Sequence, residues 1–265
     1  MTQERTTSQE KQGAAASLLN GFAVLEALAT SSRPQLGVTE ISAIVDLHKS
    51  TVSRMLTGLA EAGYVERDES TGRYRLGLGM IGLAGPLLAE LDIRRVAAPY
   101  LEELTDTTGE TSAIAIWNGA EGVVVEQYAS PHQVKHSASI GTRYHRFASS
   151  SVRVFLATLP DEEVERLLSP DGSIQFDGSL EEARAALAEV REAGVAINDG
   201  GTTVEEYGVS APVHDYRGEI AGCLTASAPR TRVQHLGTQE KLMEAVLETA
   251  AMITARLGGR EGARG

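Results

Sequence analysis

The first third of the chain alternates apolar and polar residues with a helical period in three separate segments. This pattern predicts helices over residues 17–31, 40–45 and 49–62. The residues before them, 1–16, are rich in Thr, Gln, Ser and Ala and have no apolar period, which predicts a disordered tail. The third helix has the clearest apolar stripe, formed by Val52, Met55, Leu56 and Leu59.

A short turn and a hairpin complete this N-terminal unit. Residues 46–48 predict a three-residue turn between the second and third helices, and Thr39 is predicted to be the N-cap of the second helix. The period then changes to two over 64–67 and 73–76, which predicts a β-hairpin with a polar tip. Three helices and a hairpin in this order are the outline of a winged helix-turn-helix, predicted over 17–77.

The rest of the chain reads as a second, larger domain. Several glycines and Pro86 interrupt a short apolar stretch, which predicts a linker helix over 78–90. A domain is predicted over 91–258, followed by a tail over 259–265. Its predicted elements are a helix over 92–108, strands over 112–117, 122–128 and 133–140, helices over 149–159, 161–168 and 180–193, strands over 196–197, 208–214 and 220–227, and a helix over 238–257.

The first turn of the third predicted helix combines hydroxyl groups with long cations. These side chains occupy the face opposite the apolar stripe, and such groups hydrogen-bond phosphates and base edges when a helix lies in a major groove. Arginines on the predicted wing can add phosphate or minor-groove contacts. A solvated helical hairpin inside an enzyme is the alternative interpretation. The candidate DNA-binding residues are Thr39, Lys49, Ser50, Thr51, Ser53, Arg54, Arg67, Arg73 and Arg75.

Composition changes this picture in three ways. The net charge is −12, and nearly all of it lies after Leu78, as expected if only the N-terminal part contacts DNA. No segment approaches the roughly 20 apolar residues of a membrane-spanning helix, and the N-terminus lacks the apolar region of a signal peptide, so we expect a cytoplasmic protein with no membrane partner. The single cysteine, Cys223, lies in an apolar run and is predicted to be a buried hydrophobe.

Several short motifs occur in register along the chain. In the N-terminal part they are Val-Thr-Glu-Ile-Ser at 38–42, Lys-Ser-Thr-Val-Ser-Arg-Met-Leu at 49–56, Gly-Tyr-Val at 63–65 and Tyr-Arg-Leu-Gly at 74–77. Further landmarks occur at 101–104, 108–111, 209–213 and 227–229. With these motifs the chain resembles the isocitrate lyase regulator (IclR) family of bacterial transcription factors over about residues 17–257.

The resemblance implies an α+β protein in which the winged helix-turn-helix is joined by a linker helix to a GAF-like α/β effector-binding domain with an antiparallel sheet. It implies a regulator without enzymatic activity or cofactor, acting as a homodimer or dimer of dimers on an approximately palindromic double-stranded DNA operator. It also implies a small-molecule effector, and hydroxyl and amide groups suit a small organic acid. Position by position, the implied effector-binding residues are His136, Tyr144, Phe147, Ser149, Ser150, Ser151, Asn198, Gly208, Thr225 and Ser227.

The chain also departs from the family pattern. Asp46 and His48 stand where the family usually has Gly and Pro, and the segment 145–153 differs from the usual Pro-Leu-His-Ala followed by Gly-Lys. Gly201 and Glu205 replace a usual Glu and Gly. We therefore expect a specialised effector pocket.

Two classes of function remain open from the sequence. His132, His136, His145 and Cys223 could converge on a metal, but their spacing matches no metal-binding motif, and no metal is predicted. No nucleophile elbow occurs either. The chain is therefore a ligand-responsive transcription factor, or a small-molecule-binding or catalytic GAF-like domain protein whose N-terminal helices serve association rather than DNA readout.

Overall fold

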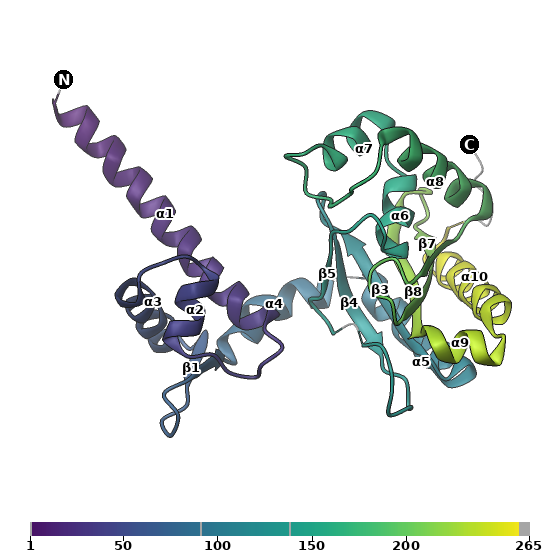
Figure 1. The fold of residues 1–265 in the computed structure, drawn as a ribbon, viewed down its shortest axis with the longest axis horizontal. Helices are drawn as coiled ribbons and strands as arrows, with labels where there is room; N and C mark the ends of the chain where they lie inside the picture. The colour runs from purple at the N-terminus through teal and green to yellow at the C-terminus, as the bar shows by residue number, and fades with distance from the viewer. Residues whose placement is uncertain (1, 91, 138, 260–265) are drawn as a thin grey trace. The chain divides into compact units, whose positions relative to one another are not determined.

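The computed structural model describes residues 2–90, 92–137 and 139–259. The chain divides into two compact units, Met1–Glu90 and Leu91–Gly265, which are drawn in Figure 1. The tail predicted over 259–265 lies outside the described residues, apart from Gly259. Within the described ranges no helix is long and apolar enough to cross a membrane.

The first unit is a winged helix-turn-helix, as predicted. Its elements are α1 (Thr2–Thr30), α2 (Val38–Ile44), α3 (Lys49–Glu61), β1 (Val65–Arg67), β2 (Tyr74–Leu76) and α4 (Gly79–Glu90). The strands β1 and β2 form the antiparallel wing. Its core is built by side chains from α1, α2, α3 and the wing, among them Val24, Ile41, Val52, Leu56, Val65 and Tyr74, each less than a tenth exposed. This burial fixes which side of α3 faces solvent.

Helix α1 covers Thr2–Thr30, with buried residues at Val24, Leu25, Ala27 and Leu28, and the disorder predicted over 1–16 stays a prediction. One prediction for this unit is wrong. The N-cap of α2 is Gly37 rather than Thr39: the Glu40 carboxylate accepts a hydrogen bond from the Gly37 N–H at 2.8 Å, and Thr39 lies exposed in the first helical turn.

Two tight backbone features set the geometry of the turn and the wing. Asp46 has a φ of +50°, a left-handed conformation that Asp tolerates better than most residues. After α3 the chain reverses through Gly63 at a φ of +79°, and the Gly77 N–H donates to the Tyr64 carbonyl at 2.8 Å. A Cβ atom at Gly77 would lie 2.4 Å from the Gly63 carbonyl oxygen, so this approach requires glycine.

The second unit is an α/β domain on one antiparallel sheet, which confirms the expected class. The strand order is β5-β4-β3-β8-β7-β6. The strands are β3 (Thr111–Trp117), β4 (Gly122–Tyr128), β5 (Arg143–Tyr144), β6 (Ala196–Asp199), β7 (Glu206–His214) and β8 (Ile220–Pro229). The helices are α5 (Asp92–Thr108), α6 (Ser150–Ala157), α7 (Asp161–Leu168), α8 (Leu180–Ala193), α9 (Arg230–Leu236) and α10 (Gln239–Arg256).

The helices cover the two faces of this sheet differently. Side chains of α5, α9 and α10 pack with Ile114, Val209 and Leu224 on one face. On the other face α6 packs with Ala113, Ala115 and Cys223. Figure 1 shows α10 on the opposite side of the sheet from α6, α7 and α8. Neighbouring residues along each strand therefore face opposite sides of the sheet and belong to chemically different environments.

Two elements of the second unit differ from prediction. The strand predicted over 133–140 does not form in its described residues; instead 130–136 is held by side-chain bonds to its carbonyls, such as Thr111 Oγ1 to His136 O at 2.6 Å and Arg232 Nη1 to Val134 O at 2.9 Å. The short strand β5 pairs with β4 in its place. Helix α9 was not predicted; it follows directly after Pro229, its N-cap.

The close approach at Gly77 generates a stability prediction. We expect Gly77→Ala to lower the free energy of unfolding of the first unit by about 1–3 kcal/mol, because the new methyl overlaps the Gly63 carbonyl. Gly58→Ala is the matched control: Gly58 lies in α3 with no atom near its Cβ position, so this change should stabilise by about 1 kcal/mol.

The two units can be monitored separately in one urea titration. The only tryptophan, Trp117, lies in β3, so its fluorescence reports on the second unit alone. Circular dichroism should show that the first unit of Gly77→Ala unfolds at a lower urea concentration, while the urea midpoint of the Trp117 fluorescence is unchanged. An unchanged circular dichroism profile would show that Gly77 is not under this constraint.

Candidate nucleic-acid interface and effector site

Helix α3 presents one polar face to solvent. Val52 and Leu56 are fully buried, whereas Ser50, Ser53 and Arg54 are exposed on the opposite side. Lys49 is exposed at the first residue of the helix, and Thr51 is half-buried. Short hydroxyls beside a long cation on one helix face can hydrogen-bond phosphates and base edges together.

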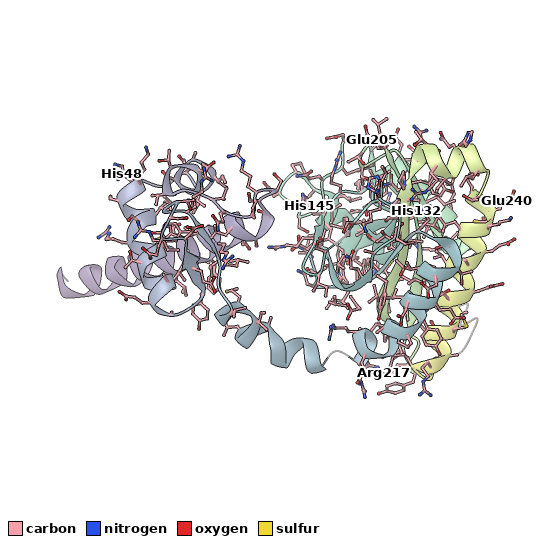
Figure 2. All side chains as sticks on the ribbon, turned by 90° about the horizontal axis from the view of Figure 1, so that it is seen from below. His48, His132, His145, Glu205, Arg217 and Glu240 are labelled. Carbon is pink, nitrogen blue, oxygen red and sulfur yellow. The ribbon has the colours of Figure 1, made fainter. Side chains whose placement is uncertain are left out.

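His48 caps this helix at the position where the sequence departs from the family pattern. His48 Nδ1 accepts a hydrogen bond from the Ser50 backbone N–H at 3.3 Å and lies 2.8 Å from the Ser50 hydroxyl. Its backbone is extended, with φ −64° and ψ 140°, as an N-cap requires. His48 is labelled in Figure 2. The His48 side chain therefore provides a hydrogen-bonded N-cap at the position where the family usually has proline.

The three wing arginines have different surroundings. Arg67 is exposed. Arg75 donates from Nε and Nη2 to Glu66 Oε2 at 2.9 and 2.7 Å, across the hairpin. Arg73 points toward α2, where Nη1 donates to Glu40 Oε2 at 2.9 Å and to the Gln35 carbonyl at 3.1 Å. Arg73 therefore connects the wing to the helices.

Glu40 receives several donors at once. The Gly37 N–H, Arg73 and Arg33 all donate to its carboxylate. These contacts, the Gly37 hydrogen bond first, hold the pKa of Glu40 below its usual range. Glu40 thus caps α2 and orients the wing with the same side chain.

Four of the predicted effector residues lie on one face of the sheet in the second unit, namely Asn198, Gly208, Thr225 and Ser227. Gly208 pairs with Ser227 and with Asn198, and Thr225 pairs with Ser210, in the antiparallel registers of β6, β7 and β8. Directly opposite residues share a face, and so do residues two apart along a strand. All five therefore lie on the face that α6 covers.

A chain of hydroxyl groups connects α6 to this face. Ser150 Oγ lies 2.7 Å from Ser210 Oγ, which lies 2.8 Å from Thr225 Oγ1. We call Ser150, Ser210, Thr225 and Ser227 the hydroxyl cluster. Beside it burial raises the pKa of Cys223 to about 12, despite hydrogen bonds with Thr225 and Ser210. The thiol is therefore neutral near pH 7, and this part of the site is polar without charge.

Asn198 anchors the loop beside the hydroxyl cluster. Its Oδ1 accepts from the Gly201 N–H at 2.8 Å, and its Nδ2 donates to Thr202 Oγ1 at 2.6 Å. Thr202 in turn donates to Glu206. A Cβ at Gly208 would lie 3.3 Å from Ser150 Oγ, so glycine lets α6 approach the sheet closely.

The other predicted effector residues do not join the hydroxyl cluster. Ser149 and Ser151 are buried, with their hydroxyl oxygens 3.0 Å apart. The His136 ring contacts the Glu205 carbonyl at 3.2 Å. Burial, together with the nearby Glu206, raises the pKa of Tyr144 to about 12. Phe147 packs against Phe176, with ring centroids 4.4 Å apart.

Two polar residues of these surfaces were missed by the sequence analysis. Thr57 is exposed on α3, one helical turn beyond Ser53, and the helical period could have identified it. Ser210 is fully buried between Ser150 and Thr225. Its position two residues after Gly208 on the same strand was the available signal. The described residues contain no group of three or more His, Cys, Asp or Glu side chains that could hold a metal ion.

These features define a winged-helix DNA-binding protein with a second α/β domain. Two family profiles cover most of the chain: the IclR helix-turn-helix domain matches residues 17–69, and the bacterial transcriptional regulator IclR C-terminal domain matches residues 86–255. The chain therefore belongs to the IclR family of bacterial transcriptional regulators. Its relatives are regulators of transcription, so the chain is a DNA-binding regulator and not an enzyme.

Individual relatives agree with this assignment. The chain is 28% identical to the HTH-type transcriptional repressor AllR of Escherichia coli K12 over 254 residues, 93% of this chain and 92% of that protein. A crystal structure of one domain of an IclR-family regulator is 47% identical, with a TM-score of 0.60, covering 63% of this chain and 97% of that one. An IclR homolog from Microbacterium hydrocarbonoxydans, crystallised with 4-hydroxybenzoate, is 25% identical with a TM-score of 0.71, covering 91% and 98%.

The different surroundings of Arg73 and Arg67 generate a paired prediction. We expect Arg73→Ala to lower both the thermal stability of the first unit and DNA affinity, because it releases the wing from Glu40 and Gln35. Arg67→Ala should lower DNA affinity alone, because this exposed cation forms no hydrogen bond or ion pair within the described residues and can pair with a phosphate. Circular dichroism melting and fluorescence anisotropy on one labelled duplex measure the two effects. Equal melting temperatures for both variants would contradict the assigned role of Arg73.

Proposed function

We propose that α3 reads an operator in the major groove and that a small organic acid bound at the hydroxyl cluster alters this binding. The exposed face of Ser50, Ser53 and Arg54 carries the DNA-binding part of the proposal. Thr39, Lys49, Thr51 and the wing arginines Arg67 and Arg75 contribute phosphate contacts around it, and Arg73, also a candidate DNA-binding residue, holds the wing in position. This function places the protein in the bacterial cytoplasm, with the DNA.

The effector part of the proposal rests on the polar face beneath α6. Ser150, Asn198, Thr225 and Ser227 bring hydroxyl and amide groups together, and the first turn of α6 adds backbone N–H groups suited to a carboxylate. The 4-hydroxybenzoate bound by the Microbacterium relative is an acid of this kind. The hydroxyls of Ser150, Ser210 and Thr225 bond one another in the structure, so a ligand must exchange these bonds for its own.

Self-association completes the proposed mechanism. Helices α1 and α4 expose large apolar side chains, among them Leu19 at 67%, Phe22 at 55% and Ile81 at 66%. Clustered exposed apolar residues favour protein contacts. A homodimer or dimer of dimers would place two recognition helices on an approximately palindromic operator.

The first prediction of this proposal concerns Arg54. Arg54→Ala should weaken specific operator binding by about 1–3 kcal/mol, because a recognition-helix cation that reaches a base edge contributes on this order. Arg256→Ala is the matched control, with the same loss of charge at an exposed position of the second unit. Mobility shifts on the intergenic DNA beside the native gene measure both. Equal affinities for parent and Arg54→Ala would exclude Arg54 from the readout.

The second prediction concerns assembly. Light scattering should give at least twice the monomer mass, both for the free protein and for the protein on DNA. Ile81→Glu should lower both this mass and the operator affinity, because association would bury the new charge in the interface. Arg166→Glu is a control for added negative charge at an exposed position of the second unit. A monomer that binds the operator tightly would contradict the proposed assembly.

The third prediction separates sensing from DNA binding. The double variant Thr225→Val with Ser227→Ala should still bind the operator but lose its response to an effector, because an effector shifts an equilibrium only through differential affinity. The probe is a panel of short hydroxy and keto acids with 4-hydroxybenzoate, screened by operator release. Thr249→Val, a buried threonine on the opposite side of the sheet, is the control. A retained response would place the sensor elsewhere, and lost operator binding would make the two residues structural.

A further inference from the structure

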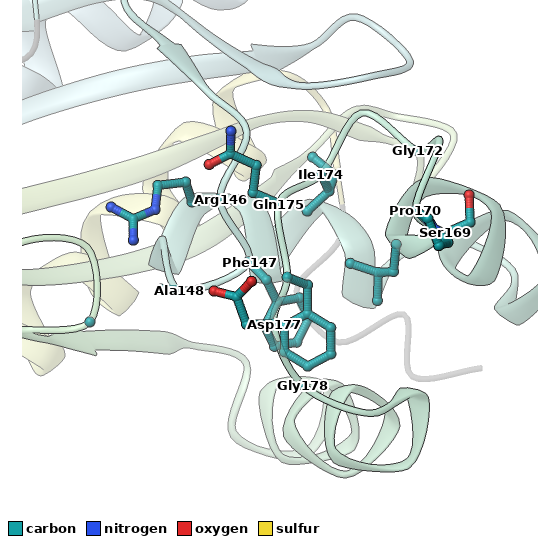
Figure 3. Close-up of a pocket in the computed structure, with 13 residues that line it drawn as sticks. Arg146, Phe147, Ala148, Ser169, Pro170, Gly172, Ile174, Gln175, Asp177 and Gly178 are labelled. Atoms are coloured by element: carbon teal, nitrogen blue, oxygen red, sulfur yellow. The ribbon is translucent and has the colours of Figure 1, made fainter.

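A cavity lies beside the loop that leads into α6. It has a volume of about 710 Å³, within the roughly 300–1,000 Å³ typical of small-molecule sites. It is lined by residues 146–148, 168–170, 172 and 174–178 and by Gly201, as Figure 3 shows. Of the predicted effector residues only Phe147 belongs to this cavity. The cavity is therefore distinct from the hydroxyl cluster.

The floor of the cavity is apolar and aromatic. Phe147 and Phe176 lie with ring centroids 4.4 Å apart and planes tilted by 47°. Ile174 and Leu168 extend this surface and are less than a tenth exposed. Aromatic faces attract both apolar groups and cations, because the ring quadrupole is negative above its plane.

Backbone hydrogen bonds hold the walls in place. The Gln175 N–H donates to the His145 carbonyl at 2.7 Å, and the Phe147 N–H donates to the Gln175 carbonyl at 2.9 Å, forming a parallel bridge between the two loops. The Ile174 N–H donates to the Leu167 carbonyl at 3.0 Å. A cavity bounded by such bonds is preformed, so a ligand needs little ordering of the chain.

The charges around the floor favour a positive ligand. Asp177 lines the cavity and forms no ion pair or hydrogen bond with the described parts of the chain. The C-terminal end of α7, at Leu168 and Ser169, also lines it, and helix C-termini carry partial negative charge. Most of the net charge of −12 belongs to this half of the chain. These three contributions are all negative and favour a cation.

One lining residue has the opposite charge. Arg146 donates from Nη1 to the Thr202 carbonyl at 2.8 Å, and among the described residues it forms no ion pair with Asp177. The arginine is thus engaged with the neighbouring loop and leaves the carboxylate available. Its positive charge still repels a cation in the cavity. Removing this charge should therefore strengthen cation binding, the opposite of what removing the Asp177 charge should do.

We propose that this cavity binds an organic cation, an amine with an aromatic or aliphatic body. The ammonium group pairs with Asp177, and the apolar body lies on Phe147 and Phe176. This site differs in position and in ligand charge from the proposed effector site, so either can exist without the other. The proposal adds a second small-molecule site to the regulator.

Isothermal titration calorimetry of the full chain tests the proposal with three probes that share a phenylethyl group and differ in the charge of its terminal substituent. We expect 2-phenylethylamine to bind, 2-phenylethanol to bind at least about fivefold more weakly, and 3-phenylpropionate to bind most weakly of the three. The preference for the amine should shrink as salt is added, because Asp177 is exposed and its charge is screened. Equal binding of the amine and the alcohol would overturn the proposal, as would absence of heat for the amine.

Five variants assign the binding to the cavity. Asp177→Asn should weaken 2-phenylethylamine binding about fivefold and Phe176→Leu should also weaken it, whereas Arg146→Gln should tighten it. Asp171→Asn, the same change in the same loop but outside the lining, should have no effect. The double variant Thr225→Val with Ser227→Ala should bind the amine normally, whatever its response to acids. Equal effects of Asp177→Asn and Asp171→Asn would show that only general surface charge is involved.

Discussion

The orientation of α3 rests on the burial of Val52 and Leu56 against α1, α2 and the wing. Both side chains are fully buried, so the helix cannot rotate about its axis without exposing them. The polar face of Ser50, Ser53 and Arg54 follows from this constraint. The contacts of His48 at the helix start and of Glu40 at the wing then fix where that face begins and what flanks it. The proposed DNA readout thus depends on apolar side chains that are buried on the opposite side of α3.

The second unit uses the two-residue period of an antiparallel sheet in a comparable way. Apolar side chains such as Val209 and Leu224 pack with α5 and α10, and the alternate positions Gly208, Ser210 and Thr225 face α6. One pair of strands therefore supplies both a core and a polar surface. The loop before α6 separates this surface from the cavity beside Phe147 and Phe176, so the two proposed sites share a wall while differing in ligand chemistry.

Local patterns predicted most of this architecture, and long-range contacts account for what they missed. The apolar stripe of α3 and the alternation of the strands were read directly from the residues. The N-cap at Gly37 was missed because it depends on a carboxylate three residues later, and the strand expected over 133–140 was wrong because Arg232, about a hundred residues away, binds the Val134 carbonyl. The pairing of Arg73 with Glu40 and the cavity at 168–178 arise only from tertiary packing.

The central claim is that the first unit distinguishes an operator from other DNA. The most direct measurement is the affinity of the full chain for the intergenic DNA of its own gene and for an unrelated duplex of equal length, over a series of salt concentrations. A reader of base edges should bind the operator at least about a thousandfold more tightly, with both affinities falling as salt rises. Equal affinity for the two duplexes at every salt concentration would contradict the account.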